Sequence, residues 1–233
     1  MNSRQSQPIF VYIVIAAIFV LTLCGIGAVT YNHFHDHGLK TASLDDTQAL
    51  AASTDVNGDW NVIDGSGPNR TSVGYTFHEL LPGQSIDTSG STNNVTGDVK
   101  VENNQLTSGK IVVDMTTLKT DQEKRDINVR SKILHTDDYP TATFEVTSPV
   151  DLSSLPGDGT SGHVTIQGNL TIMATTKPVT ADFKVLRTGT RVILGTTIPF
   201  DRTEFGVDTP EFVAAKIDTQ GELNVLITME KQS

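Results

Sequence analysis

From Asp59 onward, apolar and polar residues alternate along most of the chain. Runs in which every second residue is apolar lie at 73–77, 95–101, 111–115, 142–146, 164–172, 179–185 and 223–229. A period of two gives each strand one face against a core and one face in water. Turn sequences such as Pro82-Gly83 separate the runs. The pattern predicts a mainly β domain of roughly eight or nine antiparallel strands, and it leaves a closed barrel and a sandwich equally open.

The stretch from Thr120 to Phe144 interrupts this alternation. Thr120 and Glu123 have the spacing of a capping box, in which two side chains accept the first backbone N–H groups of a helix. One helical face would then carry Lys124, Ile127, Ser131 and Leu134. The segment ends at Tyr139-Pro140, because a residue before proline avoids the helical conformation. We therefore expect a short helix, packed through Ile127 and Leu134, that folds over an opening of the sheet as a lid.

Residues 8–29 form an apolar run without any charged side chain. A helix of about 20 residues crosses a hydrocarbon core of about 30 Å. No small-residue cleavage pattern follows the run, so we expect a retained transmembrane helix rather than a signal peptide. Arg4 precedes the run and no Lys or Arg follows it before Lys40. The positive-inside rule then places residues 1–7 in the cytoplasm and the rest outside the cell membrane, in a single-pass arrangement with 8–29 as a signal-anchor.

Residues 30–57 have no sustained apolar period and are rich in Ala, Ser, Thr and Asp, which predicts a flexible tether before a folded domain at 58–233. The single cysteine, Cys24, excludes an internal disulfide. We interpret it as a membrane-buried apolar side chain, and acylation is the alternative. His33 and His37 could share a helical face and bind a metal, but a His-rich loop is the simpler interpretation, and we expect no metal.

The chain is acidic, with 17 basic and 27 acidic residues and a formal net charge of −10. This charge argues against binding to nucleic acid and against tight adhesion to anionic lipid headgroups. No nucleophile elbow, phosphate loop or zinc-protease motif occurs in the sequence. We therefore expect a protein that is not an enzyme and holds no cofactor.

Three stretches carry a resemblance to a known family. The first comprises Thr120, Arg125-Asp126, Ser131, Leu134, Tyr139-Pro140 and Phe144; the second comprises 168–172 with 176–179; the third comprises Asp201-Arg202 with 205–207. In this order they resemble the motifs of the YceI-like family, over roughly Asp59 to Met229. The resemblance implies a lipocalin-like antiparallel barrel that holds a polyisoprenoid chain in an apolar interior.

The inward residues and the resemblance together define a candidate site. The expected apolar lining is Phe77, Val113, Met115, Leu134, Phe144, Val146, Ile172, Phe183 and Val225. Arg125, Asp126 and Arg202 are the expected polar residues of the lid and rim. The planar fork of Arg125 suits a phosphate or a quinone oxygen. The alternative, which we favour, is that Arg125 and Asp126 fix the lid to the rim through hydrogen bonds and an ion pair.

We therefore predict a membrane-anchored, extracytoplasmic protein that holds a polyisoprenoid or an isoprenoid quinone for carriage or storage, and a homodimer is possible. One alternative is an extracellular β domain with a solid core that acts through protein–protein contacts. Another is an enzyme that acts on such a lipid. The sequence does not predict the length of the ligand or its headgroup.

Overall fold

The structure is a computed structural model, and it describes residues 37–81, 83–209 and 216–232. The predicted transmembrane helix at 8–29 and the residues His33 and Cys24 lie outside these ranges. Among the described residues, no helix is both long and apolar enough to cross a membrane.

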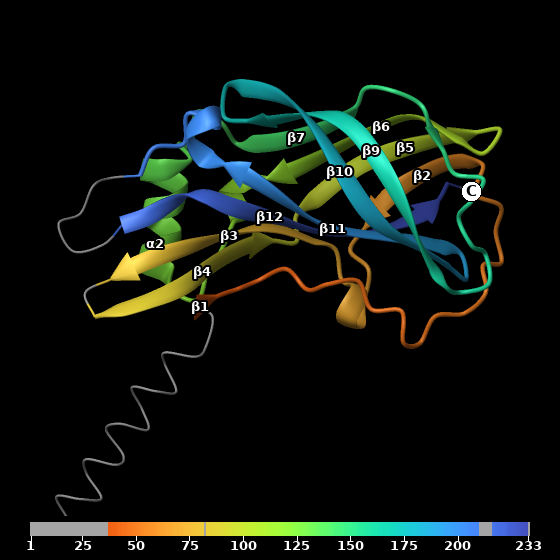
Figure 1. Ribbon diagram of the computed structural model, residues 1–233, viewed down its shortest axis with the longest axis horizontal. Coiled ribbons are helices and arrows are strands. Elements are labelled where there is room, and N and C mark those ends of the chain that lie inside the picture. Colours follow the sequence, from red (N-terminus) through yellow and green to blue (C-terminus); the bar gives the residue numbers. More distant parts are fainter. Residues whose placement is uncertain (1–36, 82, 210–215, 233) are drawn as a thin grey trace, which may run out of the picture.

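Strands make up most of the described chain (Figure 1). They are β1 (His37–Gly38), β2 (Gly58–Ile63), β3 (Ser72–Leu81), β4 (Gln84–Thr92), β5 (Val95–Glu102), β6 (Gln105–Asp114), β7 (Thr141–Val146), β8 (Val150–Asp151), β9 (Ser161–Ile172), β10 (Thr175–Thr188), β11 (Arg191–Asp201) and β12 (Lys216–Lys231). Short helical turns lie between them: η1 (Gly67–Asn69), η2 (Met115–Thr117), α2 (Glu123–Asn128), the π-helical η3 (Val129–Ile133) and η4 (Arg202–Phe205). The mainly β prediction is confirmed.

The sheet closes on itself through β12. Within the described residues, β12, β11, β10, β9, β7, β6, β5 and β2 follow one another, and β2 pairs again with β12, which closes an antiparallel ring of eight strands. The long β12 serves two partners: residues 216–226 pair with β3, and residues 228–231 pair with β2. The β3–β4 hairpin therefore extends the wall at one end, where Ser91 and Lys119 exchange backbone hydrogen bonds of 2.9 and 3.0 Å. Of the two arrangements that alternation left open, the structure has the barrel.

The helical segment between β6 and β7 lies across one end of the barrel, which we call the lid end (Figure 1). The predicted capping box is wrong, because α2 begins at Glu123 and no side chain caps its first turn. Thr120 instead donates from its backbone N–H and its hydroxyl to Asp126 Oδ1, over 2.6 and 2.7 Å. The buried Asp126 carboxylate thus ties the loop before α2 to the helix itself.

The predicted helical face is also wrong in part. Ile127 is 53% exposed, whereas Val129 and Leu134 are buried. The cause is a widened last turn, in which the backbone N–H of Leu134 donates to the carbonyl of Val129, five residues earlier, over 2.9 Å. A π turn rotates the side chains that follow it relative to an α-helix. Leu134 therefore packs inward although Ile127, Lys124 and Ser131 point away from the core.

Residues 39–57, which we call the strap, run along the outside of the barrel and are not a free tether. The strap begins after β1, which pairs in parallel with β4. Leu44 of the strap packs against Leu186, Ile193 and Leu226 on the outer face of the barrel. The carbonyl and amide of Asp45 exchange hydrogen bonds of 2.7 and 2.9 Å with the side chain of Asn69. The sequence predicted a flexible tether here because most of these contacts are made by backbone and short polar groups. Such contacts do not require a regular spacing of apolar residues.

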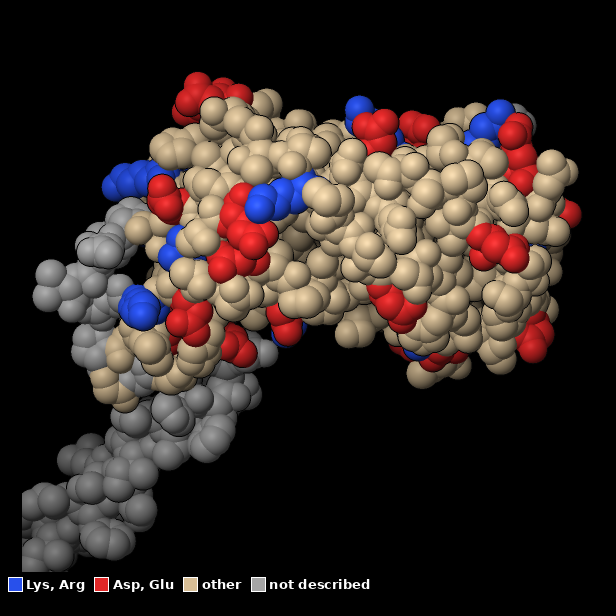
Figure 2. Space-filling view, turned by 45° about the horizontal axis from the view of Figure 1, so that its top comes forward, with Lys and Arg blue, Asp and Glu red and all other residues tan. Residues whose placement is uncertain are grey.

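Charged side chains are scattered over the outer strand faces (Figure 2). Several of the pairs that they form are well exposed, such as Lys100 with Glu102 at 2.7 Å and Lys177 with Glu204 at 3.2 Å. Exposed pairs of this kind contribute little to stability, because water and salt screen the attraction between the two charges. The barrel is therefore stabilised mainly by its interior and by the strap.

Candidate ligand-binding cavity

The interior of the barrel is not completely filled. It encloses a cavity of about 190 Å³. An apolar cavity of about 150 Å³ accommodates a benzene molecule, so this space is large enough for an apolar ligand segment. The wall extends from Met115 and Leu118 at the lid end to Val56 and Trp60 at the other end.

The inward face of nearly every ring strand contributes to this wall. Medium-sized apolar residues dominate it, among them Val99, Val101, Ile111, Ile166, Leu170, Val192, Leu194, Ile198, Leu223 and Ile227. Alternation places these side chains inside because the residues between them face the solvent. Two rings, Phe144 and Phe183, lie in the same wall with their centroids 6.4 Å apart. An eight-stranded ring has an interior of the size that holds one slender ligand.

The end opposite the lid is closed by an apolar plug, formed by Val56, Trp60, Leu152 and Leu155. All four side chains are at least 91% buried. The Trp60 indole N–H donates to the backbone carbonyl of Val56 over 2.8 Å. The last residues of the strap therefore turn from the outer face into the barrel opening, and Val56 helps to close this end of the cavity.

Few polar groups reach the cavity. The polar residues in the wall are Tyr75, Thr143, Arg187 and Trp60, and the side chain of Thr143 alternates outward because it lies between the inward residues Ala142 and Phe144. Arg187 Nη2 donates to the backbone carbonyl of Thr54 over 3.1 Å, so the guanidinium is held by the strap. Its position follows from the sequence, since residue 187 continues the inward phase of Phe183 and Val185.

Tyr75 lies at the lid end of the cavity, close to the start of α2. No hydrogen bond to its hydroxyl is found among the described residues. Burial raises the pKa of this hydroxyl well above its ordinary value, and the nearby positive charge of Arg125 acts in the opposite direction. The hydroxyl is thus a neutral donor and acceptor, and it lies over Gly90 of β4, where a Cβ would come within 2.8 Å of it. Alternation indicated that Tyr75 points inward, but it was not among the predicted site residues.

The structure brings most of the predicted lining together. Val113, Met115, Phe144, Val146, Ile172, Phe183 and Val225 all lie in the cavity wall. Phe77 does not: its ring centroid is 5.4 Å from that of Phe200, and it lies over Gly221, where a Cβ would clash with the ring. Leu134 also lies off the wall, in the cluster of Leu118, Val129 and Phe205 beneath the lid.

The three predicted polar residues have structural partners. Asp126 binds Thr120, as described above, and Arg125 forms an ion pair with Asp121. Arg202 is buried and donates to three backbone carbonyls, those of Val207 at 2.7 Å, Asp218 at 3.1 Å and Ile217 at 3.4 Å. Arg125 and Asp126 both lie close enough to Tyr75 for their charges to act on its hydroxyl, and none of the three predicted polar residues lies in the cavity wall.

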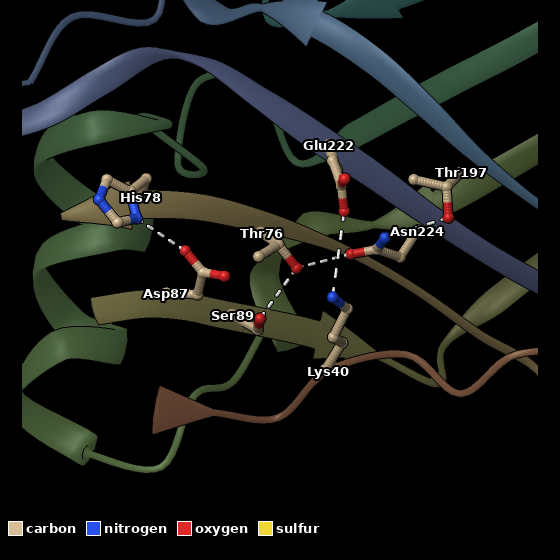
Figure 3. Close-up of polar contacts among 8 residues, drawn as sticks. All are labelled: Lys40, Thr76, His78, Asp87, Ser89, Thr197, Glu222 and Asn224. Carbon is tan, nitrogen blue, oxygen red and sulfur yellow. Dashed lines mark hydrogen bonds and ion pairs between the residues drawn. The ribbon is translucent and has the colours of Figure 1, made fainter. Parts of the chain in front are cut away.

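The residues that alternate outward on β3, β4 and β12 form a second polar cluster outside the barrel (Figure 3). Thr76 donates its hydroxyl proton to Asn224 Oδ1 over 2.7 Å and lies 2.9 Å from the hydroxyl of Ser89. All three side chains are buried. They are separated from the cavity by the strands themselves, so they belong to the packing of the outer face. Among the described residues, no three His, Cys, Asp or Glu side chains gather as a metal site.

The ring of strands and the enclosed space define a closed antiparallel β-barrel with an apolar cavity and a helical lid. The model of the YceI-like domain matches residues 62–229, and the chain belongs to this family. Two solved structures share the fold. BcnA of Burkholderia cenocepacia is 18% identical with a TM-score of 0.55, and the match covers 68% of this chain and 95% of that one. A polyisoprenoid-binding domain from Saccharophagus degradans is 14% identical with a TM-score of 0.57, and the match covers 74% and 98% of the two chains.

Two curated relatives match a shorter part of the chain. UPF0312 proteins of Vibrio parahaemolyticus and Vibrio campbellii are 29% and 31% identical over 103 residues, which is 43% of this chain. The chain spans about half the length of these relatives, 51% in each case.

Proposed function

We propose that this protein carries or stores a polyisoprenoid lipid or an isoprenoid quinone, with the chain of the lipid inside the barrel. The observation that carries the proposal is the continuous apolar wall from Met115 at the lid end to Trp60 at the plug. The Saccharophagus degradans domain of the same fold is described as polyisoprenoid-binding, which supports the same class of ligand.

The magnitude of the hydrophobic effect favours such a ligand. Each buried CH₂ contributes about 0.8 kcal/mol, so a five-carbon prenyl unit contributes roughly 3–4 kcal/mol. Association costs an estimated 4–15 kcal/mol in lost freedom of motion. A few buried units are therefore enough to offset this cost without any specific polar contact.

The polar end of the ligand belongs at the lid in this proposal. Tyr75 offers a neutral hydroxyl there, and the guanidinium of Arg125, paired with Asp121, lies nearby. A quinone oxygen or a phosphate would be recognised by these two donors. At the opposite end, the cavity meets the apolar plug, which suits the tail of the chain.

The proposal includes a membrane anchor at residues 8–29, with the barrel outside the cytoplasm. Its support is the length of the uncharged apolar run and the placement of Arg4 before it. A lipid carrier held at a membrane has its source of ligand within reach.

Two observations weigh against the alternatives. A protein with a solid core would not enclose a cavity of about 190 Å³. An enzyme acting on the same lipid would need reactive groups in the wall, and the described wall offers only Tyr75, Thr143, Arg187 and an indole that is already hydrogen-bonded. We therefore propose binding rather than turnover.

Ile172→Trp tests the proposal, because Ile172 lies in the wall with its side chain buried. The larger ring should fill the space and expel the lipid, while stability falls by no more than about 1–3 kcal/mol. Thr165→Trp is the matched control, since Thr165 is exposed on the outer face of the same strand, β9. Lipid extracted per mole of folded protein should fall for Ile172→Trp and stay unchanged for Thr165→Trp. Equal lipid in both variants would contradict the proposal.

A further inference from the structure

The chain enters the barrel domain at its lid end. His37 and Gly38 pair with Thr88 and Ser89 of β4, and the backbone N–H of Leu39 donates to Ser89 over 3.1 Å. Figure 1 shows β1 at the same end as α2. From here the strap runs away from the lid and reaches the plug at Val56.

The strap is fastened along its length, so the entry point cannot swing to another part of the barrel. Just after β1, the Thr41 and Ser72 hydroxyls lie 3.0 Å apart, and Lys40 pairs with Glu222 at 4.0 Å (Figure 3). Farther along, Asp46 binds Lys184 at 2.8 Å. The position of residue 37 relative to the lid is therefore fixed by the fold.

Only residues 30–36 separate this entry point from the apolar run at 8–29. A chain spans at most about 3.3–3.6 Å per residue, so seven residues reach roughly 25 Å. The 16 residues of β12 alone extend over roughly 50 Å. A barrel held by so short a connection keeps its lid end beside the membrane, whereas its plug end can lie far from it.

Apolar side chains without a cover gather at this same end. Four large apolar residues of the described chain are well exposed. Three of them belong to the lid end: Leu39 beside β4, Leu80 at the tip of the β3–β4 hairpin and Ile127 on α2, exposed by 46–53%. The fourth, Leu50, lies on the strap beside Thr188, away from the lid.

The charge of the lid removes the electrostatic objection to a membrane contact. The chain as a whole has a net charge of −10, but residues 119–138 contain five basic and five acidic side chains. On the face that Figure 2 shows, Lys and Arg side chains lie among the acidic ones at the lid end. The lid segment is therefore neutral overall and is not repelled by an anionic bilayer, although Glu79 and Asp87 make the neighbouring β3–β4 hairpin acidic.

We propose that the lid end is a membrane-docking surface, which rests on the bilayer that holds residues 8–29, with Leu80 and Ile127 in the headgroup region. The inference rests on the proposed anchor and extends the proposed function, because it places the polar end of the cavity, at Tyr75 and Arg125, next to the membrane. Apolar side chains that enter the interface strengthen such contacts in proportion to the area they bury.

Site-specific quenching tests this orientation in the full chain. Cys24→Ser removes the natural thiol, and a fluorophore is then placed at Ile127→Cys on the lid or at Ser154→Cys beside the plug; both positions are exposed. The protein is reconstituted in vesicles of phosphatidylethanolamine and phosphatidylglycerol that contain a lipid with a spin-labelled headgroup. We expect several times stronger quenching at residue 127 than at residue 154. Equal quenching, or stronger quenching at residue 154, would overturn the docking surface.

A pair of charge substitutions separates docking from anchoring. With the fluorophore at residue 127, Leu80→Asp should lower the ratio of docked to undocked molecules about tenfold, because it replaces an apolar side chain by a charge. Leu50→Asp is the control and should leave the ratio unchanged. Equal effects of the two substitutions would overturn the inference. Flotation of the same samples tests the membrane anchor itself. Protein that does not float with the vesicles would refute the anchor and, with it, the docking surface. Protein that floats but shows no stronger quenching at residue 127 would refute the docking surface alone.

Discussion

The two ends of the cavity are closed by different kinds of contact. At the plug end, Trp60 and Val56 are buried among apolar side chains, and the indole N–H and the Arg187 guanidinium both donate to backbone carbonyls of the strap. At the lid end, a short helix is tied down through a buried carboxylate, Asp126, and its last turn is widened. Opening the plug exposes Val56, Trp60, Leu152 and Leu155 together, whereas opening the lid breaks the contacts of Asp126 and exposes the smaller apolar set of Val129 and Leu134. We therefore expect the plug to be a stability element and the lid to be the route for the ligand.

The largest effect should follow from Trp60→Ala at the plug. Removing a fully buried large aromatic side chain costs about 3–5 kcal/mol through lost transfer free energy and the cavity left behind. Denaturant unfolding measures this loss. If the plug serves stability only, the rate of lipid exchange with donor vesicles at a temperature where the variant is folded should stay close to that of the natural protein. A stable variant with much faster exchange would show that the ligand passes the plug.

Leu134→Ala tests the apolar part of the lid. Leu134 is buried with Leu118, Val129 and Phe205, so the substitution should lower the free energy of unfolding by about 2–5 kcal/mol. Ile127→Ala is the control on the same helical segment, and it should change the free energy by about 0.5 kcal/mol or less, since Ile127 is 53% exposed. Similar losses in the two variants would contradict the effect assigned to the π turn.

Asp126→Ala should lower the free energy of unfolding less than Trp60→Ala or Leu134→Ala does, but it should change the rate of lipid exchange more. It leaves the backbone N–H and the hydroxyl of Thr120 without an acceptor, at a cost of about 1–3 kcal/mol. Asp126→Asn keeps an acceptor oxygen in the same place and should retain most of the stability. We expect lipid exchange to speed up in Asp126→Ala and to change little in Asp126→Asn. Unchanged exchange in Asp126→Ala would remove the functional distinction between the two ends.

The alternation along the strands predicted the β architecture and most of the cavity wall, because a period of two directly encodes which face is inside. Val113, Ile172 and Val225 lie in the wall for this reason. Phe77 shares the same phase, but an aromatic ring can lie over a glycine of the neighbouring strand, and here Gly221 and Phe200 hold it away from the cavity. The direction of such a ring depends on the residues of the neighbouring strand, so the alternation within a single strand does not predict it.

The strap and the lid were harder to predict. The contacts of the strap are mostly backbone and short polar side chains, which leave no periodic signal. The surface beneath the strap did leave a signal in the sequence. Leu186, Ile193 and Leu226 are apolar residues in the outward phase of their strands, and all three are buried under the strap. In the lid, one backbone hydrogen bond of the i to i+5 type moved Leu134 off the predicted face. The position of Leu134 could not be predicted from the sequence, because no residue type marks a π turn and the turn depends on how the lid packs.

The central claim is that the cavity holds one isoprenoid lipid, and native mass spectrometry of the purified full chain tests it most directly. After detergent is removed in the gas phase, we expect a species heavier than the bare chain by the mass of one lipid, and tandem dissociation should release a polyprenyl or isoprenoid-quinone ion. The adduct should be absent from Ile172→Trp and present in Thr165→Trp. Folded protein that appears only as the bare chain, from cells that contain these lipids, would contradict the claim.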